Sequence, residues 1–361
     1  MKNRNTRKFL FSEKIVTTNL RIAIVASEYS NDTSSGENIF LEQFVSLLTK
    51  SNLKIAIFLV KTDNEKNKFG YKIKKFFGIL TGTGSNPREF LDEFRPDIII
   101  VHNLFPNIGM NWIKKRQEPI LMFLHNYRLF CNSGTFFREG KECYLCIEKD
   151  RRYSVLHKCY RNSMLPNVPM AVSGYIRDGR FSDYFGNAKF ICLNPISQEI
   201  FIKCGIEKSR ITVLKNFLND IDRNQILNPK KSLNFKYLYS GRITEEKGIF
   251  DLIKCWPEEL TLDVIGKPPD KYVIDSYPNI NFHGQLNNKE LIDQLRKYDV
   301  AIFPSKWSEG YPIAVIEYMR AGLPILAKKG NTVANDVEFG KAGLTFEKFD
   351  PDVLKIGRAH V

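Results

Sequence analysis

Short apolar runs of strand type alternate with stretches of helical periodicity along the whole 361-residue chain. This alternation is typical of parallel α/β sheets, in which a crossover helix follows each strand. Strands are expected at residues 20–27, 54–60, 97–102, 120–125 and 189–193 of the first half, and at 235–240, 261–265, 301–304 and 324–327 of the second. The length suits two domains of about 150–200 residues each. We therefore predict an α/β protein with two Rossmann-like domains facing a cleft.

The polar, Asn- and Lys-rich segment 219–234 is the predicted linker. Before it lie a basic extension, 1–19, and a first domain, 20–218, with a cysteine-rich insertion at 128–162; the second domain is expected at 235–354. No apolar run approaches the roughly 20 residues that span a bilayer. The apolar stretch after the first cations is too short for a signal peptide. These features predict a cytoplasmic protein.

The net charge of +14 comes almost entirely from the first part of the chain. Residues 1–225 contain 35 Lys and Arg against 22 Asp and Glu, whereas residues 226–361 contain 19 against 18. The chain has no RNP sequence, paired Cys/His finger or Arg-rich tail, so a nucleic-acid partner is not expected. Each cation near an anionic leaflet contributes about 1 kcal/mol. We expect peripheral contact with the inner face of the cell membrane; an ordinary solvated surface is the alternative.

Two cations occupy a glycine-bounded turn after the first strand of the second half, in Gly241-Arg242 and Lys247-Gly248. Open α/β sheets bind ligands at the carboxyl ends of their strands. A pair of cations there suits a pyrophosphate, whose charge it would stabilise. A surface loop with two unremarkable cations is the alternative interpretation.

Two carboxylates, Glu309 and Glu317, flank the start of a predicted short helix in the stretch 303–324. Pro312 fits the first helical position and Gly322 the residue just past the helix end. The N-terminus of such a helix is a ready anion site. A carboxylate beside it is better suited to accept hydrogen bonds from sugar or ribose hydroxyls than to touch phosphate.

These two elements, Gly241-Arg242…Glu246-Lys247-Gly248 and Glu309-x7-Glu317, resemble motifs of retaining glycosyltransferase family four, the glycosyl transferases group 1, which have the GT-B fold. The resemblance covers roughly residues 20–350. It implies transfer of a sugar from a UDP- or GDP-sugar with retention, by front-face departure and attack. It implies no metal or other cofactor for catalysis.

The resemblance also implies roles for side chains of the second half. Glu309 would hold hydroxyls of the donor sugar, and Glu317 would hold the ribose of the nucleotide. Arg242 and Lys247 would grip the pyrophosphate.

Further roles fall to main-chain groups and to the first half. Gly310 and Tyr311 would offer backbone N–H donors to the donor molecule. Gly36 would let the first loop approach the donor from across the cleft. His125, at a strand end, would lie beside the transferred sugar.

Four of the seven cysteines, Cys131, Cys143, Cys146 and Cys159, fall close together in the insertion 128–162. A C-x2-C pair flanked by two further cysteines could bind a structural zinc tetrahedrally. Unliganded thiols and a redox role are the alternatives. Because many cations surround the cluster, this insertion is also the expected face for the acceptor and the membrane.

The last seven residues, Lys355–Val361, resemble translated adapter sequence, and we interpret them as non-native. Members of the family continue past this point with further helices. The second domain is therefore expected to be incomplete at its C-terminal end.

Together these patterns predict a retaining glycosyltransferase of bacterial surface polysaccharide synthesis, such as lipopolysaccharide or capsule, acting on a glycan or lipid-linked acceptor. A sugar-nucleotide epimerase of the same two-domain shape is one alternative. A non-catalytic nucleotide-sugar-binding protein is another, because the loop at Gly36 has one glycine where two adjacent ones are frequent in the family.

Overall fold

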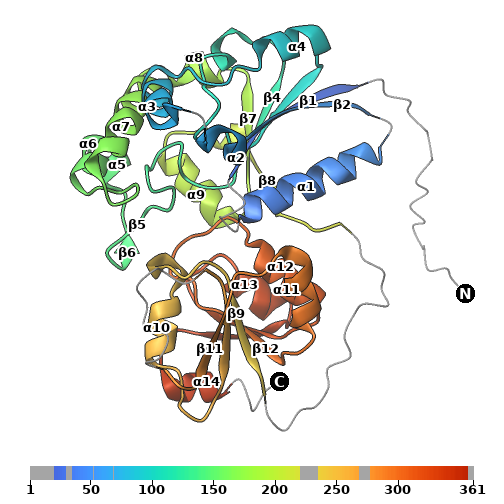
Figure 1. Cartoon of the computed structure of the whole chain (residues 1–361), viewed down its shortest axis with the longest axis vertical. Coiled ribbons are helices and arrows are strands. Elements are labelled where there is room, and N and C mark those ends of the chain that lie inside the picture. Colours follow the sequence, from blue (N-terminus) through green and yellow to red (C-terminus); the bar gives the residue numbers. More distant parts are fainter. Residues whose placement is uncertain are drawn as a thin grey trace, which may run out of the picture.

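A computed structural model of the chain describes residues 20–29, 35–51, 53–67, 69–219, 235–267 and 277–356. In this part of the chain, two six-stranded parallel sheets lie one above the other, each covered by helices (Figure 1). The predicted α/β class with two Rossmann-like domains is confirmed. The predicted extension 1–19, nearly all of the linker 219–234 and residues 357–361 lie outside the described residues.

The first sheet has the strand order β2-β1-β3-β4-β7-β8. Its strands are β1 (Arg21–Glu28), β2 (Lys54–Lys61), β3 (Ile98–Val101), β4 (Ile120–Leu124), β7 (Ala188–Cys192) and β8 (Ile211–Val213). Successive side chains of β1 enter opposite core layers: Ala23 and Val25 join one, and Ile22 and Ile24 join the other. A strand buried on both faces explains why this segment reads as a continuous apolar run.

Helices cover both faces of the first sheet (Figure 1). They are α1 (Gly36–Thr49), α2 (Thr62–Lys66), α3 (Tyr71–Thr81), α4 (Arg88–Phe94), α5 (Leu145–Glu148), α6 (Arg152–Leu156), α7 (Met164–Asp178), α8 (Phe181–Phe185) and α9 (Pro195–Lys203), with single 3₁₀ turns at Ile113–Lys115 and Lys208–Arg210. The cysteine-rich insertion contains α5, α6 and a small hairpin of β5 (Phe137–Arg138) and β6 (Lys141–Glu142).

The second sheet has the order β11-β10-β9-β12-β13-β14, which is 3-2-1-4-5-6 when its strands are numbered alone. Its strands are β9 (Tyr237–Ser240), β10 (Leu262–Ile265), β11 (Ile280–Gly284), β12 (Val300–Phe303), β13 (Ile325–Lys328) and β14 (Gly343–Phe346). The order reverses between β9 and β12. In open α/β sheets ligands bind outside the carboxyl ends of the strands at this switch point.

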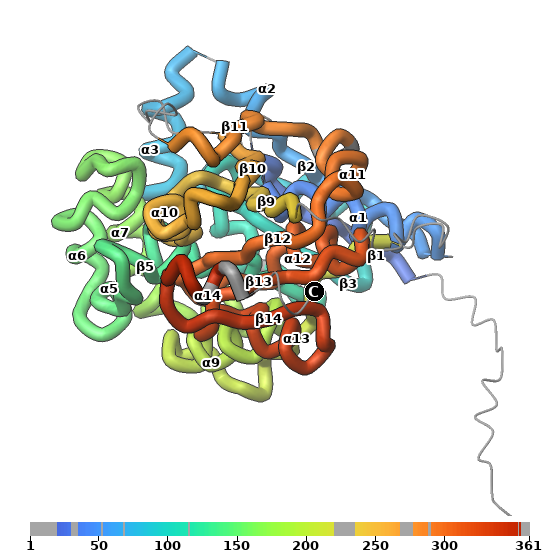
Figure 2. Tube along the Cα trace, turned by 90° about the horizontal axis from the view of Figure 1, so that it is seen from below, coloured from blue at the N-terminus to red at the C-terminus, as the bar shows by residue number. Residues whose placement is uncertain are grey.

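The helices of the second domain are α10 (Ile249–Lys254), α11 (Asn288–Leu295), α12 (Ile313–Arg320), α13 (Ala334–Phe339) and α14 (Pro351–Ile356), with a 3₁₀ turn at Glu245–Lys247. Seen from below in Figure 2, α14 and β14 lie side by side. α14 extends two residues into the tail interpreted as non-native, and Leu354 is buried in the core.

Helix α12 is shorter than expected and begins after Pro312, which precedes the first helical residue instead of occupying it. Its end is as predicted. Gly322 has a φ of +70°, and the N–H of Leu323 donates to the carbonyl of Tyr318. This is the Schellman arrangement, in which a left-handed glycine satisfies the last carbonyls of a helix.

In the described part of the chain, no helix is both long enough and apolar enough to cross a membrane.

Gly248 tests how tightly the loop after β9 packs against the loop after β12 at the switch point. Its φ is +71°, and a Cβ at this position would lie 2.1 Å from the carbonyl oxygen of Pro304. We expect Gly248→Ala to destabilise the protein by about 1–3 kcal/mol beyond the strain of the left-handed backbone. Urea unfolding would measure the loss.

The matched control is Gly284→Ala. Gly284 has a φ of +72° and no atom within 4 Å of the added Cβ. This variant should lose only the roughly 1–2 kcal/mol of backbone strain. Equal losses in the two variants would contradict the proposed packing of Gly248 against Pro304.

Candidate active site

The loops after β9 and β12 meet at the switch point of the second sheet. Lys247 Nζ, from the first loop, lies 2.5 Å from Glu309 Oε2, from the second. The main chains also join, because the N–H of Lys306 donates to the carbonyl of Glu246. The fold therefore brings together the cation-bearing turn and the carboxylate loop that the sequence singled out separately.

Glu309 is only 5% exposed, and its two carboxylate oxygens differ in their surroundings. Oε2 pairs with Lys247, whereas Oε1 is buried without a hydrogen-bond partner among the described residues. The same holds for Ser305 Oγ, Trp307 Nε1 and Thr244 Oγ1 in these two loops. Buried polar atoms are normally paired. These loops thus hold four polar atoms that a bound molecule could satisfy, of which the sequence predicted only Glu309.

The two predicted pyrophosphate ligands differ in availability. The Arg242 side chain is 46% exposed and lies 3.6 Å from a carboxylate oxygen of Glu246. The Lys247 side chain is 16% exposed, and its ammonium is bound by Glu309 and lies 5.9 Å from the centre of the Trp307 ring. Arg242 is therefore the more exposed of the two cations and has the looser contact with a carboxylate.

The predicted backbone donors lie in the turn before α12. Among the described residues, the N–H groups of Gly310 and Tyr311 have no hydrogen-bond acceptor. Glu317 follows within α12 and is 4% exposed. The N–H groups of Gly310 and Tyr311 thus come just before the start of the helix, where the partial positive charge of its N-terminus favours an anion.

The carbonyls of residues 308–311 bind side chains of the first domain, and we call this contact the interdomain seam. Tyr127 Oη lies 2.7 Å from the first carbonyl, and Asn194 Nδ2 lies 2.9 and 2.7 Å from the second and third. Asn216 donates to the fourth. The sequence analysis missed Tyr127 and Asn194; their position just after predicted strands was the available signal.

Gly36 lies at the same junction, where α1 meets α12. A Cβ on Gly36 would lie 3.4 Å from Ile313 Cγ1. The next residue, Glu37, accepts a hydrogen bond from Asn126 Nδ2 at 2.6 Å. Burial raises the pKa of Glu37, and Asn126 and nearby cations, including Arg242 of the second domain, oppose the rise. Gly36, the first residue of α1, therefore lies against the first residue of α12, and its predicted role towards a donor stays a prediction.

His125 makes two kinds of contact. Its main chain lies against Gly310, and its imidazole ring contacts a second histidine, His102. Its carbonyl oxygen would lie 3.2 Å from a Cβ on Gly310. Its Nε2 lies 3.0 Å from His102 Nδ1. Burial lowers the pKa of both rings, that of His125 to about 4. Because burial lowers both pKa values, both imidazoles are neutral at pH 7, and in their contact one nitrogen donates while the other accepts.

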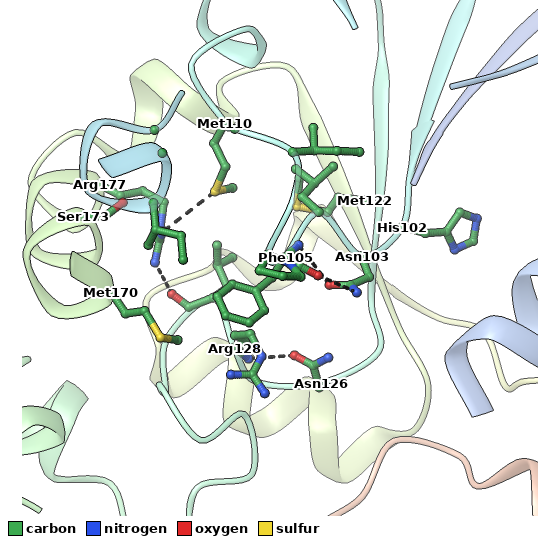
Figure 3. A pocket seen from close by; sticks show the side chains of 18 of the residues that line it. His102, Asn103, Phe105, Met110, Met122, Asn126, Arg128, Met170, Ser173 and Arg177 are labelled. Carbon is green, nitrogen blue, oxygen red and sulfur yellow. Dashed lines mark hydrogen bonds between the residues drawn. The ribbon is translucent and has the colours of Figure 1, made fainter. Parts of the chain in front are cut away.

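A cavity of about 150 Å³ opens beside His125 in the first domain. Figure 3 shows Arg128 and Arg177 among its lining, together with Phe105, Met110 and Met170. Arg177 is 8% exposed and donates to the carbonyl of Leu129, while its Nε is buried without a partner. Burial lowers the pKa of Arg177 to about 10, so it remains charged at pH 7.

Within the described residues, no carboxylate lies within 4 Å of either pocket guanidinium. Ion pairs in this region instead join Arg151 to Asp178 and Arg152 to Asp150. Arg128 instead donates to two main-chain carbonyls and covers the Phe105 ring at 4.7 Å. The cavity therefore combines apolar and polar side chains with two cations that an anionic group could approach.

The cysteine-rich insertion turns part of its surface towards the second domain. Ser308 Oγ donates to Glu142 of the β5–β6 hairpin at 3.1 Å, and Lys306 lies over the Phe137 ring. Among the described residues, no three or more His, Cys, Asp or Glu side chains are arranged to hold a metal ion. The structure gives the zinc hypothesis for Cys131, Cys143, Cys146 and Cys159 no support, and it stays a prediction.

Residues 220–357 match the family model for glycosyl transferases group 1. The second domain is a group 1 glycosyltransferase domain. Among solved structures, HepE of Anabaena in complex with UDP and glucose is similar to this chain, with a TM-score of 0.53 and 15% identity over 94% of this chain and 89% of HepE. That likeness confirms the GT-B fold for the group 1 domain and its partner.

Curated relatives match part of the chain. A 41.2 kDa protein in the cps region of Klebsiella pneumoniae is 28% identical over 40% of this chain and 42% of its own length. Alpha-galactosylglucosyldiacylglycerol synthase of Streptococcus pneumoniae is 21% identical over 45% of this chain and 49% of its own length. The match thus spans less than half the length of each of these relatives.

The neutral histidine pair predicts a loss of stability in acid. The pKa of His125 falls from 6.5 to about 4 on folding, so between these values the unfolded chain binds the additional proton. Stability therefore decreases as the pH falls from 6.5 to 4, by up to about 3 kcal/mol from this group. Urea unfolding at several pH values would measure the slope.

His125→Gln should flatten this slope, because glutamine does not titrate. His157→Gln, at an exposed histidine, should keep the wild-type slope. A slope unchanged in His125→Gln would show that the pair is not neutral and buried in solution.

Proposed function

We propose that the protein is a retaining glycosyltransferase that moves a sugar from a UDP- or GDP-sugar to a glycan or lipid-linked acceptor in bacterial surface polysaccharide synthesis. The contact between Lys247 and Glu309 at the switch point of the group 1 domain is the observation that carries the proposal. It holds a buried carboxylate whose second oxygen has no partner among the described residues.

In the donor half, Arg242 and Lys247 bind the diphosphate, and the N–H groups of Gly310 and Tyr311 add main-chain donors. Glu309 Oε1 accepts a hydroxyl of the transferred sugar, and Glu317 holds the ribose. Charge developing on the departing diphosphate is stabilised by these fixed donors. HepE, solved with UDP and glucose, supports a nucleotide-sugar donor.

Retention follows from front-face substitution. The bond from the anomeric carbon to the diphosphate oxygen breaks, the acceptor oxygen bonds to that carbon, and the acceptor proton passes to the departing phosphate oxygen. A neutral His125 fits this scheme, because it can donate or accept a hydrogen bond beside the sugar without taking the proton. Catalysis needs no metal in this scheme.

The acceptor approaches from the first domain, where the cavity beside His125 combines apolar walls with Arg128 and Arg177. Such a lining suits a molecule with an anionic and an apolar part. Two relatives support a role at the cell surface: one lies in a cps region, and the other is named as a glycolipid synthase.

A thermal-shift panel of UDP, GDP and their sugar conjugates, with and without EDTA, tests the donor half. A ligand at 100 times its dissociation constant adds about 2.7 kcal/mol of stability. We expect one nucleotide to raise the melting temperature whether or not EDTA is present. A cooperative melt that no nucleotide shifts would contradict the proposal.

Glu309→Gln tests the chemistry. The variant removes the carboxylate charge and weakens the contact with the sugar, so transfer should fall about 100-fold while nucleotide binding persists. The measurement is release of UDP or GDP in the presence of acceptor. Glu347→Gln, at an exposed carboxylate of the same domain, should transfer at the wild-type rate. Undiminished transfer by Glu309→Gln would remove Glu309 from the site.

A further inference from the structure

Exposed apolar side chains are concentrated on one part of the first domain. Of the 15 large apolar side chains exposed in the described residues, ten belong to α3, α6, α7 and the turn before α3. These helices pack together, α3 on α7 and α7 on α6. They lie on the same side of the molecule in Figures 1 and 2. Large contiguous apolar patches of this kind mark interaction sites.

Helix α7 has two sharply different faces. Its exposed apolar residues are Met164, Leu165, Val168, Val172, Tyr175 and Ile176. At 3.6 residues per turn, these six fall within an arc of about 120°. The opposite face holds the buried residues Met170, Gly174 and Arg177. Helix α7 therefore has two apolar faces: one is buried in the first domain, and the other is exposed to solvent.

Helix α3 is apolar without being buried. None of its eleven residues is buried, and the apolar side chains of Ile73 and Phe77, one turn apart, are 67% and 57% exposed. Lys72 and Lys74 are also exposed on this helix. A helix that presents both apolar and basic side chains to solvent is typical of surfaces that lie in the interface of a membrane.

The charge around these side chains is mainly positive. Residues 69–81 and 149–180 contain ten Lys and Arg, of which Arg151 and Arg177 are buried, and two carboxylates. Both carboxylates, Asp150 and Asp178, are already paired with arginines. An apolar surface surrounded by cations has the chemistry to meet an anionic lipid surface. A symmetric second copy would place the same cations opposite one another, which disfavours self-association.

We propose that the exposed faces of α3 and α7, the α3–α7 face, dock on an anionic lipid bilayer. The cavity beside His125 lies directly behind this face, because Ile79 of α3 and Met170, Ser173 and Arg177 of α7 line it. Docking there delivers the anionic end of a lipid-linked acceptor to Arg177 without the lipid leaving the bilayer. This last step rests on the proposed function, whereas the docking itself does not.

The membrane contact thus moves from the cysteine-rich insertion to α3 and α7. The hairpin of the insertion contacts the loops of the group 1 domain. The later part of the insertion, α6 with the exposed Leu156, adjoins the α3–α7 face.

Co-sedimentation of the full chain with vesicles tests the docking. We expect binding to vesicles of phosphatidylglycerol and phosphatidylcholine, weaker binding to phosphatidylcholine alone, and a decrease at high salt. Phe77→Glu and Tyr175→Glu should each weaken binding about tenfold or more, because they place an anion in the apolar face. Phe339→Glu, at a 95% exposed phenylalanine of α13 in the other domain, is the matched control and should bind like the wild type.

Equal binding by Phe77→Glu, Tyr175→Glu and the wild type would overturn the proposal. Dimerisation of the wild type that both variants abolish, with no vesicle binding, would assign the face to a second copy and overturn it too. A nucleotide thermal shift on the same proteins separates the two proposals. A retained shift with lost vesicle binding in the variants supports docking through this face. Wild-type vesicle binding without any nucleotide shift leaves the docking in place and contradicts the proposed function.

Discussion

The geometry of the site depends on the interdomain seam. Carbonyls of residues 308–311 belong to the second domain, yet they accept hydrogen bonds from Tyr127, Asn194 and Asn216 of the first. Each such bond contributes about 1 kcal/mol net. Two apolar side chains of the second domain also cross this contact. Trp307 and Ile313 pack within core clusters of the first domain. Glu309 is therefore positioned by both domains at once.

The two halves of the site handle charge differently. In the second domain, the buried carboxylate of Glu309 is compensated by Lys247, so charge is present and balanced. In the first domain, burial keeps His102 and His125 neutral, and the positive charge is held by Arg128 and Arg177 at the cavity. Under the proposed function, an anionic acceptor would meet fixed cations while His125, the group proposed to lie beside the sugar, stays uncharged. This division suits a reaction in which the leaving group takes the proton.

Local sequence patterns predicted the helices and strands well, but they did not predict which elements and side chains contact one another. The apolar runs that became β3 and β4 are buried on both faces, so the pattern alone revealed them. The helix end at Gly322 was also predicted from a local pattern. Pro312 was expected at the first helical position but lies one residue before it, because its ψ of 129° is extended. Strand order, the pairing of His102 with His125 and the burial of Arg177 are long-range results of packing. No spacing in the sequence encodes them.

The seam has an evolutionary consequence. First-domain side chains recognise main-chain carbonyls of residues 308–311, and every amino acid supplies a carbonyl. Exchanging the side chains of Glu309 or Tyr311 therefore leaves these docking bonds available. Side chains in this segment can therefore change between related proteins while the relative placement of the two domains is kept.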